Sequence, residues 1–365
     1  EWINGSLALA YRTGLHPSPM DQPDYLAILR SNETTADWVD YLDGIGPTRV
    51  PATLPEGDAF IAALHDLDVP DVDIETLVRL WPEVSNNADL SWLVDRSVHS
   101  LLLHMDEVSG PPAFPKLPEG FGDLGRYFYA FVYTTMLPHT RTLHQRRGIP
   151  EDVTQATLAD VGRHFLIHRE QHGTHGMSNP DWMMLHARGL IFQIGRLQFE
   201  RGHLGTSTSR SIQAAGFPCE KGDPVISVHI PGHMGPMSPE ACDASFAAAG
   251  PFFREHFPEE LPALGVCRSW LLDKQLSDYL PATSNILRFQ QRFRHAYRPE
   301  PNNRTTLEFV FRTPDCPLDE LPQRTTLERA VVQHIRDGRQ LHGGVGWLEW
   351  QPAPDLVDPT RRDTA

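Results

Sequence analysis

The spacing of apolar residues changes part-way along this 365-residue chain, and that change limits the possible folds more than any other feature. In the first half, apolar side chains recur every three or four residues, as at 92–108 and 154–166, with polar residues between them. Such a period is typical of a helix that buries one face. We predict a helix at both places, and Thr154 is the expected N-cap of the second.

From about residue 185 onward the pattern is typical of β-strands, because β-branched and aromatic residues stand in alternating or continuous apolar runs. The expected strands are 190–200, 224–230, 266–272 and 307–311, and the expected helices between them are 239–253 and 284–293. Alternation of this kind predicts a domain that contains both a sheet and helices.

We therefore predict an α+β protein with a largely helical N-terminal domain, residues 1–180, and an α/β domain, residues 181–350. Hydrophobic residues make up 40% of the chain, which is enough to give two domains of this size a core each. Residues 351–365 are charged and contain prolines, so we expect a frayed tail there.

Charge, apolar runs and cysteine spacing limit which partners the protein can bind and in which compartment it is expected. Acidic residues outnumber basic ones by 47 to 32, and the net charge of −15 disfavours binding to nucleic acid or to an anionic membrane, both of which need a positive surface. No run of about 18 apolar residues is present, and the first residues lack the pattern of a signal peptide. The four cysteines are scattered without a CxxC pair, which favours reduced thiols. We expect a cytoplasmic protein that binds neither nucleic acid nor membrane.

A metal site is one alternative for the histidine-rich segment 168–175. His168 and His172 would share one face of a helix. However, Gly173 and Gly176 end any helix here, and no HExxH or similar ligand spacing is present. The segment is typical of a polar helix end, so no metal is expected.

The most informative segment is 225–240, in which a buried strand leads into a glycine-containing loop and then into a helix. Ser238 is the expected N-cap of that helix and Pro239 its first residue. Backbone N–H groups at such a helix start, together with the helix dipole, favour the binding of phosphate oxygens. Glycines in the loop let the backbone come close to a ligand.

This segment resembles the GNAT family of acyl-CoA-dependent N-acyltransferases, and so do the segments that follow it. The strand at 266–272 and the helix that begins near Asn285 are similar to the fifth strand of that family and its following helix. More narrowly, the chain resembles bacterial two-domain acyltransferases with a helical N-terminal domain and a GNAT-like C-terminal domain. The runs that carry this likeness include His229-Ile230-Pro231, Ser269-Trp270-Leu271-Leu272 and Ser284-Asn285-Ile286. The resemblance implies a mixed, mainly antiparallel sheet in the second domain.

The resemblance also implies an acyl-CoA co-substrate and the residues that hold it. In the family the strand before the loop pairs with the pantetheine arm, and the loop holds the diphosphate of CoA. The residues that match these positions are Val228, Ile230, Gly232, His233, Met234, Gly235, Met237, Ser238 and Asn285.

Two departures from the family's pattern bear on the donor. The usual loop is Gln/Arg-x-x-Gly-x-Gly/Ala, whereas this chain has Gly232, Gly235 and Met237 at the three positions, and Pro236 removes one N–H. The helix after Asn285 has no tyrosine where the family commonly has its general acid. An acyl-carrier-protein thioester as the donor, and a non-catalytic GNAT-fold binding protein, are therefore kept as alternatives.

Direct transfer of an acyl group to an amine needs a base for the ammonium proton and an acid for the leaving thiolate. His229, at the end of a strand, is the first candidate base, and Glu200 is the second. Ser269 and Cys267 are candidate acids. The structural alternatives are a core histidine, a solvated carboxylate and small residues packed in a core.

The acceptor is expected to be an amine on a small molecule, bound where the two domains meet. Trp182, His186 and Arg196, which lie near the domain boundary, are the expected substrate contacts. The function predicted from the sequence is thus acyl transfer from acyl-CoA to a small-molecule amine.

Overall fold

The structure is a computed structural model that describes residues 23–46, 52–313 and 315–350. These residues form two compact units. One contains the described residues up to Arg146 together with Thr154–Gly189, and the other contains Arg147–Val153 and the described residues from Leu190 onward. The boundary expected after residue 180 falls at the start of a helix, and the tail expected at 351–365 lies outside the described residues.

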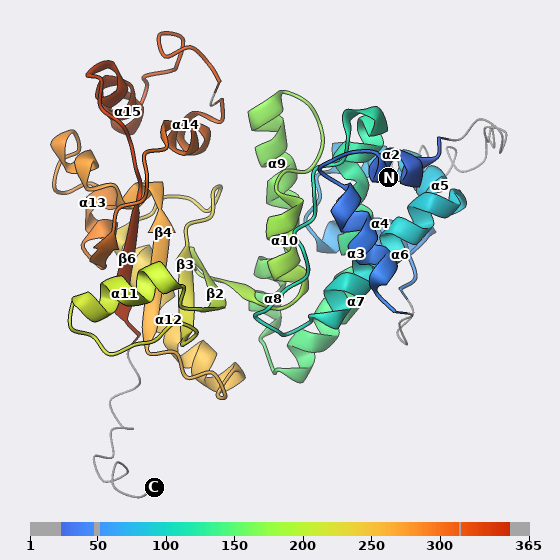
Figure 1. Cartoon of the computed structure of the whole chain (residues 1–365), viewed down its shortest axis with the longest axis horizontal. Helices are drawn as coiled ribbons and strands as arrows, with labels where there is room; N and C mark the ends of the chain where they lie inside the picture. The colour runs from blue at the N-terminus through green and yellow to red at the C-terminus, as the bar shows by residue number, and fades with distance from the viewer. Residues whose placement is uncertain (1–22, 47–51, 314, 351–365) are drawn as a thin grey trace, which may run out of the picture. The chain divides into compact units, whose positions relative to one another are not determined.

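The first unit is helical (Figure 1). Phe60 and Phe131 illustrate its aromatic core, since their rings stack with centroids 5.5 Å apart. The long helix α7 is buried along most of its length, and α4, α5, α6 and α10 pack against it. No helix of the described residues is long and apolar enough to cross a membrane. The helical elements from residue 23 to 189 are α2 (Tyr25–Arg30), α3 (Ala36–Gly44), α4 (Gly57–Asp66), α5 (Asp71–Asn86), α6 (Ala88–Leu103), η1 (Glu119–Phe121), α7 (Gly122–Arg146), α8 (Glu151–Leu158), α9 (Asp160–His172) and α10 (Pro180–Ala187).

Two expectations for this unit can be compared with the structure. The helix expected at 92–108 is confirmed as α6, which begins and ends a few residues earlier. The helix expected at 154–166 is instead two helices, α8 and α9, and Thr154 is wrong as an N-cap. Thr154 lies buried inside α8, with its hydroxyl 3.0 Å from Nδ1 of His144. The helix thus begins three residues before Thr154, and the Thr154 hydroxyl contacts a side chain of another helix.

The second unit contains a six-stranded sheet with the strand order β1-β2-β3-β4-β6-β5. β3 and β4 are parallel, and the other neighbouring strands are antiparallel. The α+β class and the mixed, mainly antiparallel sheet are thus confirmed. The strands are β1 (Ile191–Ile194), β2 (Leu197–His203), β3 (Pro224–His229), β4 (Leu264–Ser269), β5 (Arg294–Tyr297) and β6 (Gly344–Glu349).

Helices cover both faces of this sheet (Figure 1). Because side chains of a strand alternate between faces, Ile226 packs in the core under α12, whereas Val225 packs in a separate core with Ile212 of α11. The other elements of this unit are α11 (Thr206–Ala214), α12 (Pro239–His256), η2 (Trp270–Leu272), η3 (Lys274–Asp278), α13 (Asn285–Gln290), α14 (Asn303–Phe311) and α15 (Thr326–Arg336).

Two expected strands of this unit are wrong, and a third, 266–272, is confirmed only as far as Ser269, because 270–272 form the short helix η2. The segment 190–200 is a hairpin, in which a two-residue turn at Gly195 joins β1 to β2. Gly195 has a φ of +62°, and a Cβ there would lie 2.7 Å from Oγ of Ser245, so glycine suits this turn on two grounds. The segment 307–311 belongs to the helix α14, because the Asn302 side chain accepts from the N–H of Thr305 and caps a helix start. A short apolar run by itself does not distinguish the two structures.

Candidate functional site

The carboxyl ends of β3 and β4 stop pairing with each other. Their ladder comprises three residue pairs and ends at Ser227–Val266. Beyond that pair, β3 continues to His229 beside β2, and β4 continues to Ser269 beside β6. Ligands of open α/β sheets commonly bind beyond the carboxyl ends of parallel strands, so this part of the sheet is the candidate site.

His229 and Glu200 come together at this place. Across the β2–β3 pair His229 is opposite Gln198, so Glu200, two residues further along β2, lies on the same face of the sheet. Nε2 of His229 is 2.7 Å from Oε2 of Glu200. The two side chains are 26% and 22% exposed, respectively. An imidazole held by a carboxylate and open to solvent is suited to taking up a proton from a ligand.

The neighbouring residue Val228 faces the opposite side of the sheet. Its side chain is buried in the core beneath α12, and Ile230 and Met237 pack against the same core. The contribution predicted for Val228 is therefore a backbone contact with a ligand.

The loop between β3 and α12 is held by Arg196, which stands in the β1–β2 turn. Nε of Arg196 donates to the carbonyl of Gly235, and Nη1 donates to the carbonyl of Pro231, both at 3.1 Å. Its backbone N–H donates to the hydroxyl of Ser245 on α12 at 2.7 Å. The sequence predicts a substrate contact for Arg196, whereas its guanidinium fastens the loop through two carbonyls.

The start of α12 agrees with the sequence in one respect and differs in another. Ser238 is confirmed as the N-cap, since its hydroxyl accepts from the N–H of Ala241, and Pro239 is the first residue. The exposed carboxylate of Glu240 bonds to its own backbone N–H and to the Ser238 hydroxyl, and these bonds lower its pKa. An acidic side chain thus already uses a donor that the sequence assigns to phosphate.

The remaining loop residues have differing exposure. His233 is exposed and has a φ of +57°, in the left-handed region. Met234 is half-buried, and Gly235, with a φ of +72°, is exposed. Gly232 lies beside Arg312, because a Cβ added to it would be 3.1 Å from Nη2 of that arginine.

Two arginines near the loop were not predicted as site residues. Nη2 of Arg292 donates to the carbonyl of Pro239 at 3.0 Å, and the same guanidinium forms an ion pair with Asp243. Arg312 reaches Gly232 from 80 residues further along the chain, so no sequence spacing points to it. Arg292 lies in the segment after Asn285, which resembles a helix of the GNAT family, so its position in the sequence could have indicated it as a site residue.

The candidate acids lie at the end of β4. The hydroxyl of Ser269 accepts from the N–H of Leu271 at 3.1 Å and still has its own proton to donate, so its role stays a prediction. Cys267 is fully buried, and burial raises the pKa of its thiol to about 12. A buried thiol of this kind is unsuited to exchange with a ligand.

Asn285 is the first residue of the short helix α13 and is exposed. The N-cap of α13 is Ser284, whose hydroxyl accepts from the N–H of Leu287. Asn285 is therefore not the cap of this helix, and its contact with the donor stays a prediction.

Trp182 and His186 lie on α10 in the helical unit. His186 is 1% exposed, and its Nε2 is 3.0 Å from Oδ2 of Asp160. Trp182 packs against the helical core, with its ring 6.2 Å from that of His186. His186 is thus buried beside Asp160, and its contact with a substrate stays a prediction.

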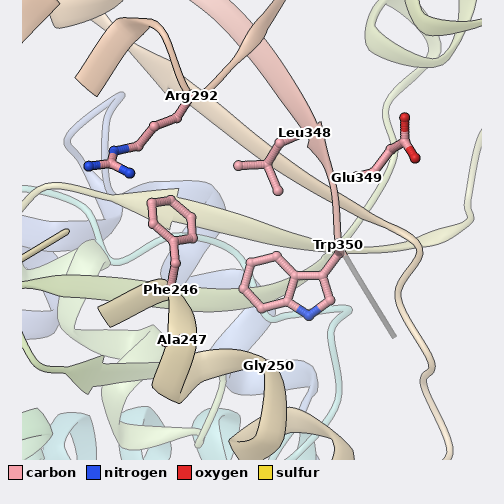
Figure 2. A pocket seen from close by; sticks show the side chains of 7 residues that line it. All are labelled: Phe246, Ala247, Gly250, Arg292, Leu348, Glu349 and Trp350. Carbon is pink, nitrogen blue, oxygen red and sulfur yellow. The ribbon is translucent and has the colours of Figure 1, made fainter. Parts of the chain in front are cut away.

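A pocket of about 360 Å³ lies on the α12 side of the sheet (Figure 2). It is at the amino end of β4, since Leu264 pairs with the pocket residue Glu349, and Ser269 is at the other end of that strand. None of the predicted site residues, all of which are described, lines it. The pocket is lined by Phe246, Ala247, Gly250, Arg292, Leu348, Glu349 and Trp350.

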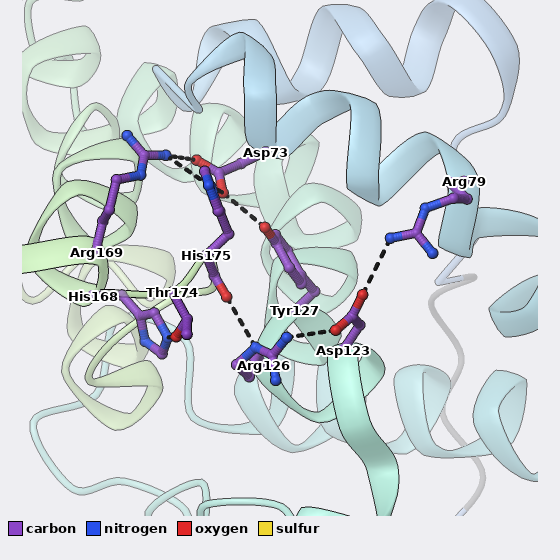
Figure 3. Close-up of polar contacts among 9 residues, drawn as sticks. All are labelled: Asp73, Arg79, Asp123, Arg126, Tyr127, His168, Arg169, Thr174 and His175. Carbon is purple, nitrogen blue, oxygen red and sulfur yellow. Dashed lines mark hydrogen bonds and ion pairs between the residues drawn. The ribbon is translucent and has the colours of Figure 1, made fainter. Parts of the chain in front are cut away.

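The histidine-rich segment takes part in a network of polar contacts (Figure 3). The fully buried Asp73 accepts from the hydroxyl of Tyr127 at 2.7 Å and from Arg169 at 2.8 Å. Nε of Arg126 donates to the carbonyl of His175 at 2.9 Å. In the described parts of the chain, no three His, Cys, Asp or Glu side chains are grouped to hold a metal ion. These contacts fix the chain after α9.

Comparisons with known proteins cover both units. Residues 58–189 match the N-acyltransferase N-terminal domain, and residues 191–348 match the GNAT-like C-terminal domain. No protein of curated function matches the chain.

Solved structures similar to the chain are acyltransferases with 36% sequence identity to it. One, in complex with CoA and 10C-teicoplanin, has a TM-score of 0.81, with coverage of 90% of this chain and 100% of that one. A second, in complex with decanoyl-CoA and teicoplanin, has a TM-score of 0.79 and the same coverage. A mutant acyltransferase in complex with octanoyl-CoA has a TM-score of 0.80, with coverage of 90% and 99%.

Proposed function

Because the chain belongs to the family of acyltransferases that join an N-acyltransferase N-terminal domain to a GNAT-like C-terminal domain, we propose that it moves an acyl group from an acyl-CoA thioester to an amine of a small-molecule acceptor. The observation that carries this proposal is the pair formed by His229 and Glu200, 2.7 Å apart, where β3 and β4 cease to pair. The complexes of similar acyltransferases with acyl-CoA and with teicoplanin support acyl-CoA as the donor and a small molecule as the acceptor.

In the proposed reaction the amine nitrogen attacks the thioester carbonyl, a C–N bond forms and the C–S bond breaks. Neutral His229 takes the proton that the amine loses, and the carboxylate of Glu200 orients the ring and stabilises the imidazolium that results. The CoA thiolate takes up a proton, for which Ser269 is the candidate donor; solvent then returns a proton to the Ser269 oxygen, and His229 releases to solvent the proton that it took from the amine. No covalent enzyme intermediate is needed.

The donor is proposed to bind at the end of β3. Its pantetheine arm would lie along the backbone of Val228 and Ile230, on the side that β4 no longer pairs. Its diphosphate would lie at the loop 231–238 and the start of α12, where N–H groups and the helix dipole favour anions. The acceptor amine would approach from the face that carries His229.

The test separates the donor, the acceptor and the chemistry. Calorimetric titration compares CoA, octanoyl-CoA and decanoyl-CoA with the same acyl groups on an acyl carrier protein. Release of the CoA thiol is then followed with a panel of small-molecule amines and matched alcohols, and products are identified by mass spectrometry. We expect saturable binding of acyl-CoA and transfer to amines. Transfer from the carrier protein alone, or to alcohols alone, contradicts the proposal.

A further inference from the structure

The connection between β5 and β6 is far longer than the pairing of these strands requires. They are antiparallel neighbours, which a turn of about two to five residues can join. Here the connection spans 298–343 and contains α14 and α15. Thr325 and Glu328 form a capping box at the start of α15, and a small core that includes Phe311 and Val331 holds the two helices together. The insertion is therefore a packed part of the second unit.

The first helix of this insertion ends beside the loop that follows β3. Its C-cap is Arg312, which has a φ of +62°, in the left-handed region that residues other than glycine adopt at a cost. From there the guanidinium extends to Gly232, where an added Cβ would lie 3.1 Å from Nη2. Arg312 thus stands in the space that a side chain at position 232 would take.

The loop itself brings little positive charge to this place. Between Ile230 and Ser238 the one ionisable residue is His233. A diphosphate needs cations or N–H donors around it, and the planar guanidinium matches phosphate oxygens better than other side chains do.

We propose that Arg312 binds the diphosphate of the donor, so that the β5–β6 insertion supplies a cation that the loop lacks. The inference rests on the proposed use of acyl-CoA. It also accounts for glycine at the first position of the loop, where the GNAT pattern has Gln or Arg. A larger residue at 232 would compete with Arg312 for the same space.

The first test compares donors with and without a diphosphate. Octanoyl-CoA and octanoyl-pantetheine share the thioester and the arm, but only the former carries the nucleotide and its phosphates. We expect Arg312→Gln to weaken CoA binding about tenfold in calorimetric titration, as loss of a charged hydrogen bond does. Its kcat/KM with octanoyl-pantetheine should equal that of the wild type. Arg312→Lys should retain part of the CoA affinity. If Arg312→Gln does not fold, the titration with CoA is done with Arg312→Lys instead.

The matched control is Arg304→Gln, because Arg304 lies on the same helix and forms an exposed ion pair with Asp315. It should bind CoA like the wild type. A second variant tests the shared space: adding Gly232→Arg to Arg312→Gln should return most of the CoA affinity, since Gly232 is not in the left-handed region that requires glycine.

Two results overturn the inference: Arg312→Gln binds CoA like the wild type, or it loses activity equally with both donors. If the wild-type protein itself binds no CoA, the proposed function fails as well. The wild-type titration therefore distinguishes failure of the site from failure of Arg312 alone.

Discussion

The two units of the molecule use charged side chains in different ways. In the helical unit Asp73 and Asp160 are 0% and 3% exposed, and each carboxylate is bound by groups of the same unit. Burial alone would raise the pKa of Asp160, but the hydrogen bond and charge of His186, with the charge of Arg163, hold it well below its usual range. In the sheet unit the pair at the end of β3 is about a quarter exposed. Charges enclosed by their own partners stabilise one arrangement of a fold, whereas an exposed acid–base pair can exchange a proton with a ligand.

The largest effect should come from removing the exposed base. We expect His229→Ala to lower kcat by about 10²–10⁴, the usual contribution of a general base, with little change in the melting temperature. Glu200→Gln should lower kcat less, because it removes the charge but keeps an acceptor for the ring. Steady-state release of CoA thiol at saturating donor and a thermal melt provide the measurements.

The control for the base is His203→Ala. His203 is an exposed histidine at the opposite end of the same β2–β3 pair. A rate for His229→Ala within about threefold of the wild type, or an equal loss in His203→Ala, would remove His229 as the base.

The next largest effect should be on stability, in the helical unit. We expect Asp160→Ala to lower the free energy of unfolding by about 3–5 kcal/mol, because it leaves the buried His186 and the half-buried Arg163 without their carboxylate. Urea unfolding followed by circular dichroism measures the change. Asp315→Ala removes an exposed ion pair and should leave the unfolding curve unchanged. If both variants had the same unfolding curve, the buried ion pair of Asp160 would contribute no more to stability than the exposed ion pair of Asp315.

A smaller effect should appear with pH. Burial lowers the pKa of His164 and of His168 to about 4, from an ordinary value of 6.5. Such a histidine binds fewer protons in the folded state, so its contribution to stability is complete above about pH 6.5 and is lost as the pH falls toward 4. For the enclosed His164 we expect a loss on the order of 3 kcal/mol across this range. His168, which is 8% exposed, should contribute in the same direction.

The pH effect is measured as a difference between proteins, because acidic residues also titrate in this range. Urea unfolding of the wild type and of His168→Gln is compared at several pH values between about 7 and 4. Glutamine keeps hydrogen-bonding atoms but does not take up a proton, so the variant should lose less stability at low pH than the wild type. Parallel curves would show that His168 contributes nothing.

The smallest effect concerns the acidic side chain at the start of α12. Because the carboxylate of Glu240 bonds to an N–H at the proposed phosphate site, Glu240→Gln should raise the affinity for CoA about threefold in calorimetric titration. Glu255→Gln, near the other end of α12, is the matched control and should have no effect. Weaker binding by Glu240→Gln would indicate that this carboxylate supports the loop instead of competing with phosphate.

The sequence was informative where the deciding contacts are between near neighbours. The hydroxyl of Ser238 and the N–H of Ala241 are three residues apart, and the helix expected at 239–253 is confirmed. The errors have different causes. The run 307–311 fits both a strand and a helix. Thr154 is of a residue type that often caps helices, but here its hydroxyl contacts a histidine of another helix.

The contacts of the candidate site join residues that are far apart in the sequence, so the sequence is less informative there. His229 and Glu200 were each predicted from their places on strands, but the contact between them spans 29 residues and depends on the β2–β3 register. Arg196 was placed near a ligand by its position at the boundary, yet its partners are carbonyls of a loop 35 residues or more away.

The sequence by itself determined the α+β class, the likeness to two-domain acyltransferases and the strand–loop–helix that ends β3, because periods and caps act over a few residues. The tertiary structure alone decided that an imidazole meets a carboxylate at the strand end, that Arg196 and Arg312 both reach the loop, and that His186 is enclosed with Asp160. Such contacts follow from the packing of whole cores and from strand register, which bring together side chains whose separation along the chain carries no signal.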